Sequence, residues 1–143
     1  KNMYETIKTV HSILAYIALA ILVLASLNAI YGVSSKKLFA AKDLRLSLFV
    51  LIFCHIQLVI GFILYFLSPK GFEAISQMSN GALRLTAVEH PLTNIIAIAL
   101  ITIGWSKHKK EESNNGKFKK IAIFYTIGLV LILSRIPWSS WLA

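Results

Sequence analysis

Few ionisable side chains interrupt the long apolar stretches of this 143-residue chain, and each of them is a candidate for chemistry. They are His11, His55, His90 with its neighbour Glu89, and Arg135. Because an ionisable group is costly to bury in lipid, such groups usually face the interior of a helix bundle and serve a function. Three imidazoles favour metal or haem ligation, or proton transfer.

The three histidines are expected at a similar depth if consecutive helices alternate in direction. His11 and His90 each lie 8 residues after the expected start of their helices, and His55 lies 12 residues before the expected end of its helix. At a rise of 1.5 Å per residue, all three fall ~12–18 Å below one set of helix ends. The three imidazoles are therefore expected to share one layer.

A bis-histidine haem needs two imidazoles on facing helices with room for a flat macrocycle between them. His11 and His90 fit best, because the first and third helices of an up-down four-helix bundle are diagonal partners and both carry small side chains on the histidine face. His55 is the alternative ligand, or a hydrogen-bonding group at a second site.

Three further residues fit a haem site. Gly128 allows close approach of a ring, and Arg135 on the same helical stripe, like Arg84, is suited to bind an outward-facing propionate. The competing interpretation is structural, since a single buried histidine is more often an interhelical hydrogen-bonding group and Arg135 can equally extend to the interface. Glu89 is either a proton-relay carboxylate or an interfacial residue.

Charges divide the chain into four apolar stretches, which predict an all-α membrane protein, an antiparallel bundle of four transmembrane helices in one domain over residues 1–143. The hydrophobic share of 57% supports this class. The predicted helices lie near 3–33, 43–67, 82–107 and 118–136, with Asp43 as a cap for the second helix and Pro91 as a kink in the third.

Basic residues predict the orientation of the helices. Ten of the fifteen Lys and Arg fall in the loops after the first and third helices, which places these loops in the cytoplasm and both termini on the other side. Trp138 and Trp141 fit an outer aromatic belt. The net charge of +9 is thus a topology signal rather than a sign of nucleic-acid binding, and His108, in the basic loop, is expected to be solvated.

Nearly the whole chain resembles a family of small bacterial four-helix membrane proteins described as cytochrome b-like. The residues that carry the resemblance are His11-Ser12, Cys54-His55-Ile56-Gln57, Gly61 to Phe66, Val88-Glu89-His90-Pro91, Ile103-Gly104 and Ile136-Pro137-Trp138. The resemblance implies a haem b electron carrier in the bacterial cytoplasmic membrane. The chain has no Cys-x-x-Cys-His motif, so the haem would be held non-covalently.

The favoured hypothesis is therefore a haem b-binding protein or subunit that transfers electrons within the membrane, in contact with lipid and with other subunits of a redox complex. A quinone is a candidate second cofactor. The first alternative is a cofactor-free accessory subunit of a larger membrane complex, in which the histidines only connect helices. A weaker alternative is a proton or metal-ion conductor. Whether the protein is an enzyme stays open, and an electron-transfer or accessory role is favoured over catalysis.

Overall fold

The computed structural model describes residues 2–141, and every regular element in that part of the chain is a helix. Four long helices dominate: α1 (Met3–Ser35), α2 (Ala41–Leu67), α4 (His90–Lys110) and α5 (Asn114–Ser134). The segment between α2 and α4 forms three short elements, the 3₁₀-helix η1 (Phe72–Gln77), α3 (Gly81–Arg84) and the π-helical turn η2 (Leu85–Glu89), and α6 (Trp138–Trp141) follows α5. The prediction of an all-α chain is confirmed.

Three helical segments are long and apolar enough to cross a membrane: Met3–Ser35, Ala41–Leu67 and Gly81–Lys110. Large hydrophobic side chains such as Leu27, Val59 and Val130 are about 60% exposed, as expected for a surface in contact with lipid. The chain is therefore a multi-pass membrane protein. The helix α5 does not meet the same criterion, because its first two turns carry Lys117, Lys119 and Lys120.

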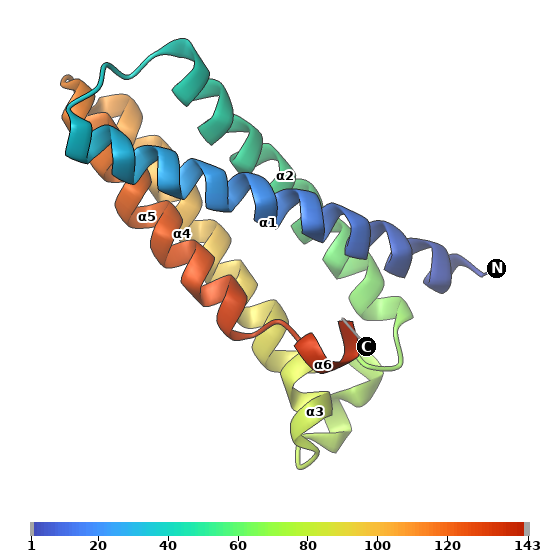
Figure 1. The fold of residues 1–143 in the computed structure, drawn as a ribbon. Helices are drawn as coiled ribbons and strands as arrows, with labels where there is room; N and C mark the ends of the chain where they lie inside the picture. Colours follow the sequence, from blue (N-terminus) through green and yellow to red (C-terminus); the bar gives the residue numbers. More distant parts are fainter. Residues whose placement is uncertain (1, 142–143) are drawn as a thin grey trace.

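The long helices pack around a ring in the order α1, α2, α4 and α5, so that α1 lies diagonally opposite α4. Figure 1 shows α4 and α5 side by side along their lengths, whereas the N-terminal half of α1 extends away from α5. The short loops 36–40 and 111–113 lie together at one end, called here the inner end, and the segment 68–80 lies at the opposite, outer end. The lysines of the inner end lie in loop 36–40 and in the adjoining ends of α4 and α5.

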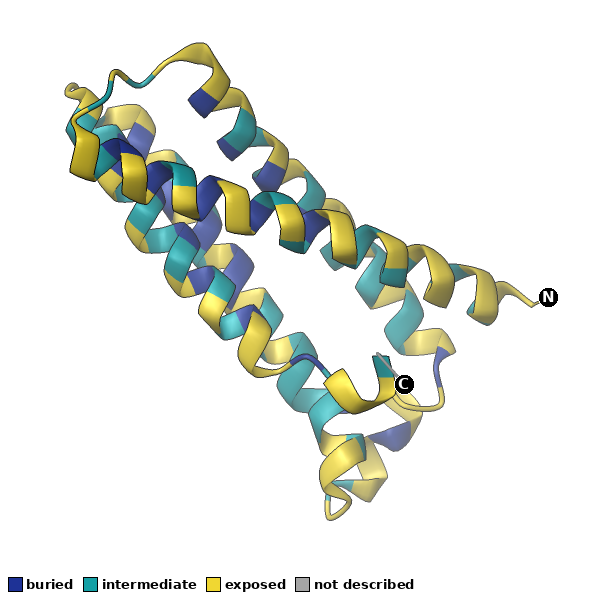
Figure 2. Ribbon diagram, viewed as in Figure 1, coloured by how far each residue is buried: buried dark blue, intermediate teal, exposed yellow. Residues whose placement is uncertain are grey.

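Burial differs between the two ends. The buried residues of α1 run from Ala18 to Gly32 and those of α2 from Asp43 to Cys54, so both sets lie toward the inner end. Figure 2 shows that the N-terminal half of α1 is mostly exposed. The inner half of the molecule is therefore a packed core, and the outer half is more open.

Polar side chains stabilise the inner half. The Asp43 carboxylate accepts hydrogen bonds from Asn28 Nδ2 and from the backbone N–H of Ala40, both at 2.8 Å, which confirms that Asp43 caps α2. Tyr125 is fully buried, and its hydroxyl donates to the carbonyl oxygen of Ser47 at 2.7 Å. These bonds connect α1, α2 and α5 within the core.

The third predicted helix, 82–107, is divided, because α3, the π turn η2 and α4 share its length. In η2 the backbone N–H of His90 donates to the carbonyl oxygen of Leu85, five residues earlier. Pro91 lacks an N–H and follows at once, so the irregularity takes the form of a π turn where a proline kink was expected. The fourth helix begins and ends earlier than predicted, because Ser113 caps its first turn and the helix stops before Pro137.

Candidate functional site

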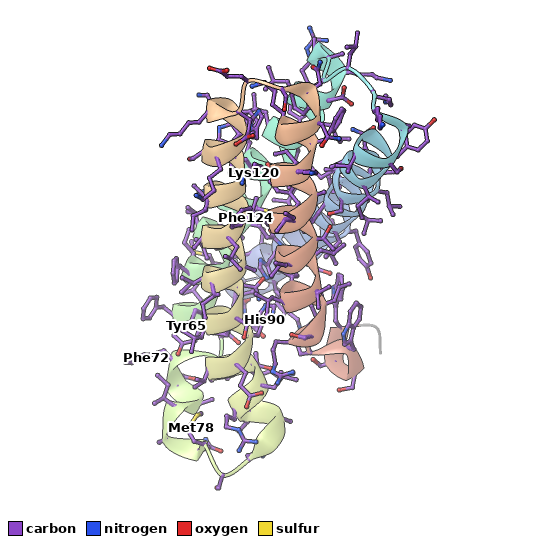
Figure 3. The ribbon with its side chains drawn as sticks, turned by 90° about the vertical axis from the view of Figure 1, so that its left-hand side faces the viewer. Tyr65, Phe72, Met78, His90, Lys120 and Phe124 are labelled. Carbon is purple, nitrogen blue, oxygen red and sulfur yellow. The ribbon has the colours of Figure 1, made fainter. Side chains whose placement is uncertain are left out.

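A cavity of about 120 Å³ lies in the outer half, between α1, α2 and α4. Apolar side chains form most of its wall. The polar residues that line it come from all three helices and from the segments beside them: His11, Gln57, Tyr65, Ser68, Thr86, His90 and Asn94. Figure 3 shows His90 and Tyr65 at a similar level along the helices, between the outer segment that holds Phe72 and Met78 and the inner end that holds Lys120. Two of the three predicted histidines thus share one cavity.

His90 has a defined orientation at the start of α4. Its ring Nδ1 lies 3.0 Å from the carbonyl oxygen of Arg135, in the segment that follows α5. A carbonyl oxygen only accepts, so Nδ1 carries the proton and Nε2 keeps its lone pair. Asn94, one turn later, lies against the same imidazole and donates to the His90 carbonyl oxygen. The arrangement is typical of a metal-ligating histidine, whose second nitrogen is held by a backbone carbonyl.

His11, by contrast, has an unsatisfied ring. Its Nδ1 is buried and has no hydrogen-bond partner among the described residues, and the same is true of Gln57 Oε1 beside it. Gln57 Nε2 donates to the His11 carbonyl oxygen at 2.7 Å, which joins α2 to α1 at the level of the imidazole. Buried polar atoms without partners are uncommon, and two of them at one cavity indicate that the site takes a further polar partner.

The Gly61 backbone lies close to the His11 ring. A Cβ at Gly61 would be 3.4 Å from His11 Cε1, so the absent side chain lets α2 pass close to the imidazole. Both residues line the cavity, so this contact forms part of its wall.

His55 lies elsewhere. Its side chain is exposed on α2, outside the cavity lining, and its Nδ1 is 2.7 Å from the carbonyl oxygen of Leu51. All three histidines were expected in one layer because of their depth along the helices. Depth does not determine to which side of its helix a side chain points. His55 faces the lipid side of α2, and its ring is held by its own helix.

The two predicted arginines meet at one carboxylate. Arg84 Nε lies 2.9 Å from Glu89 Oε2, and Arg135 Nε lies 3.6 Å from Glu89 Oε1. Arg84 also donates to the carbonyl oxygen of Met78. Glu89 precedes His90 directly, so this charge cluster lies next to a residue that lines the cavity, although none of its three members does so itself.

Gly128 is used for helix packing. A Cβ at this position would lie 2.8 Å from Ile101 Cγ1 and 3.2 Å from the Ala97 carbonyl oxygen, so the glycine lets α5 approach α4. It does not line the cavity.

The prediction that His108 is solvated is wrong. His108 is only 1% exposed, its Nδ1 lies 2.6 Å from the Trp105 carbonyl oxygen, and its ring packs against Phe39 and Trp105. The α4 helix extends to Lys110, beyond its predicted end, which turns His108 inward instead of leaving it in a loop.

Three residues of the site were missed by a search for ionisable groups. Gln57 and Asn94 carry uncharged amides, and Ser12 accepts a hydrogen bond from the Trp141 indole at 2.7 Å beside His11. Two of them could have been found from their distance in sequence to a histidine. Asn94 follows His90 by four residues, which places both on one side of a helix, and Ser12 follows His11 directly.

The residues described include no group of three or more His, Cys, Asp or Glu side chains that could hold a metal ion. Comparisons with protein-family models, with curated proteins and with solved structures found no match.

Proposed function

We propose that this chain is a membrane protein that binds one haem b non-covalently, with His11 and His90 as axial ligands, and transfers electrons within the membrane. The observation that carries the proposal is that both imidazoles reach one cavity from diagonally opposed helices. The Nδ1–H of His90 is held by a backbone carbonyl, which leaves Nε2 as the ligating atom. The unpaired polar atoms of His11 and Gln57 support a ligand at the same place.

The cavity would have to widen before it could hold a haem. Pockets for drug-sized ligands occupy roughly 300–1,000 Å³, and the cavity between the histidines is about 120 Å³. The N-terminal half of α1 has no buried residue before Ala18. Hydrogen bonds from Gln57 to the His11 carbonyl oxygen and from Trp141 to Ser12 nevertheless hold this half in place. To widen the cavity between His11 and His90, the protein would have to bend or break these two contacts, and the inner core would stay intact.

The chemistry supplied by bound haem b would be one-electron transfer. The protein's own part would be to hold both imidazoles, to exclude water from the apolar walls and to supply cations at the outer margin through Arg84 and Arg135. Glu89 lies beside the site and is a candidate proton acceptor if a quinone is the redox partner. An electron that enters must leave, so we expect association with other subunits of a redox complex.

In this proposal α5 is the fourth span of an antiparallel bundle. Its uncharged stretch from Ile121 to Ser134 would cover about 21 Å at 1.5 Å per residue, and Lys117, Lys119 and Lys120 would extend to the inner headgroups. The lysine-rich inner end would face the cytoplasm and both termini the other side of a bacterial inner membrane.

The test is a visible absorption spectrum of the protein purified from haem-replete cells, oxidised and then reduced with dithionite. A sharp reduced α-band of the haem b type is expected. Single changes His11→Ala and His90→Ala should each abolish the six-coordinate low-spin spectrum, and His55→Ala, on the lipid side of α2, is the matched control.

The contrary outcomes are distinct. No haem spectrum in replete, folded protein would refute the proposal and favour a cofactor-free accessory subunit. A spectrum lost in His55→Ala but kept in His11→Ala would assign the second ligand to α2.

A further inference from the structure

An open pocket of about 390 Å³ lies at the inner end, between the loop that follows α1 and the start of α5. Four residues line it: Lys36, Lys37, Asn114 and Asn115. Figure 1 shows this loop beside the start of α5, and a hydrogen bond of 2.9 Å from the Phe39 N–H to Asn114 Oδ1 connects the two. The pocket is thus in the other half of the bundle from the histidine cavity, and its volume falls in the range of small-molecule sites.

The backbone at the end of α1 brings two consecutive lysines to this pocket. Among the residues that the structure describes, Lys36 is the only non-glycine residue with a positive φ, at 55°. The backbone N–H groups of Lys36 and Lys37 both donate to the Gly32 carbonyl oxygen and so end the helix. Glycine is the usual residue in this left-handed position, because a side chain there costs energy. A lysine therefore carries a conformational cost at this position, which makes its ammonium group a candidate for a function.

The pocket carries positive charge without an internal counterion. Both ion pairs within residues 2–141 involve Glu89 at the outer end, so Lys36 and Lys37 have no carboxylate partner in that part of the chain. Glu111 is near the pocket in sequence, but its carboxylate lies against Gly116 and it does not line the pocket. The two ammonium groups are therefore available to an anion from outside the protein.

The asparagines shape the other side of the pocket. Asn115 Nδ2 donates to the Val33 carbonyl oxygen at 3.4 Å, which holds the start of α5 against α1. Because Asn114 turns Oδ1 toward the Phe39 N–H, its amide nitrogen keeps two N–H donors. Two ammonium groups and an amide donor suit an anion with several oxygens, and a phosphate group is such an anion.

Aromatic rings mark the depth of the pocket in the membrane. Lys37 Nζ lies 5.4 Å from the centroid of the Tyr31 ring, and Lys109 Nζ lies 5.9 Å from that of Trp105 at the same end. Tyrosine and tryptophan gather at the level of the lipid head groups, and lysines at helix ends extend to the same level. The phosphates nearest to Lys36 and Lys37 are therefore those of the membrane lipids.

We propose that this pocket binds the phosphate of an anionic phospholipid, with Lys36 and Lys37 as its cations and the Asn114 amide as a neutral donor. Basic pockets between helices at a membrane face bind such head groups. Phosphatidylcholine carries the same phosphate, but the lysines would repel its trimethylammonium group, so the pocket selects lipids with a net negative charge. The inference is independent of haem binding, because it concerns the opposite end of the bundle.

The test is a titration of the full chain in detergent with phosphatidylglycerol, in which native mass spectrometry measures the dissociation constant of the first bound lipid. Lys36→Gly and Lys37→Gln should each weaken this binding about fivefold, the contribution expected of one basic residue near an anionic lipid surface. Lys36→Gly also relieves the left-handed conformation, so it should unfold no more easily than the wild type. Weaker binding without a loss of stability distinguishes lipid binding from damage to the fold.

Lys119→Gln is the matched control, because Lys119 is exposed on α5 at the same end and does not line the pocket. It removes the same charge and should change the dissociation constant by less than about twofold, since solvent and salt screen a more distant charge. Phosphatidylcholine should bind more weakly than phosphatidylglycerol and equally in all variants.

Four outcomes would overturn the proposal. Equal weakening by Lys119→Gln and Lys37→Gln would show a diffuse charge effect instead of a site. Wild-type affinity in both Lys36→Gly and Lys37→Gln would show that the pocket takes no part, and equal affinity of the wild type for the two lipids would exclude selection by charge. Displacement of phosphatidylglycerol by an equal concentration of inorganic phosphate would assign the pocket to a soluble phosphate rather than to a lipid.

Discussion

The indole N–H of Trp141 donates to the Ser12 hydroxyl at 2.7 Å, and this bond joins the C-terminal end of the described chain to α1 directly beside His11. The Trp141 ring also stacks on Tyr16, with centroids 4.6 Å apart. The segment that ends at Trp141 begins at Arg135, whose carbonyl oxygen holds His90. One short segment, Arg135 to Trp141, therefore contacts the surroundings of both candidate ligands.

Trp141→Phe should keep the aromatic contact and lose the hydrogen bond, which lowers the free energy of unfolding by about 0.5–1.5 kcal/mol. Ser12→Ala should cost a similar amount, and the double variant should cost less than the sum of the two. Titration with sodium dodecyl sulfate in mixed micelles, followed by circular dichroism, measures these values. Strictly additive losses would show that the two side chains act separately.

Tyr125→Phe should destabilise the inner core. The phenol is fully buried and donates to the Ser47 carbonyl oxygen, so its removal costs about 1 kcal/mol. Tyr31→Phe is the matched control, because Tyr31 is 60% exposed and its variant should unfold as the wild type does. If both changes have the same effect in the same titration, the buried hydroxyl has no special role.

Asp43→Ala should be the most damaging of these changes. It removes the acceptor of two partly buried hydrogen bonds at 2.8 Å and leaves the Asn28 amide and the Ala40 N–H without this partner. Hydrogen bonds to a charged group are worth about 1.5–3 kcal/mol each, so a loss of about 2–4 kcal/mol is expected. Thermal unfolding in detergent, with the exposed Glu112→Ala as control, checks this, and equal melting temperatures would contradict the capping role.

Gly128→Ala tests the contact between α4 and α5. Alanine favours a helix by about 1 kcal/mol over glycine, but the new Cβ would crowd Ile101 and the Ala97 carbonyl oxygen, and overpacking costs about 1–3 kcal/mol. The backbone oxygen cannot rotate away, so net destabilisation of up to about 2 kcal/mol is expected. At Gly81 the nearest atom to a new Cβ is 3.8 Å away, and Gly81→Ala should be neutral or stabilising. A more stable Gly128→Ala in the same assay would show that the helices adjust.

The helical class and the membrane setting could be predicted because charge and apolar length report them directly. Three of the four expected helices were located to within a few residues, and Asp43 was recognised as a cap. His11 and His90 both line one cavity, as expected from their depth and from the order of the helices, and their role as a ligand pair stays a prediction.

The sequence did not show to which side of its helix each side chain points in the folded protein. His55 shares the depth of the other histidines but points outward, and the direction of a side chain depends on how α2 rotates against its neighbours. His108 lies at the end of a helix whose length was underestimated, so its burial was missed. The contact between Trp141 and Ser12 joins residues at opposite ends of the chain, and no local pattern reports it.

The π turn Leu85–Glu89 holds one residue more than an α turn would. Because the turn absorbs this residue, Arg84 and Glu89 lie on one side of the helix although they are five residues apart. Deleting one residue between them would restore a regular helix with the two side chains four residues apart, again on one side. The same deletion inside α4 would instead rotate all that precedes it by about 100°. Related chains should therefore tolerate a difference of one residue in the turn but not in the helix that follows it.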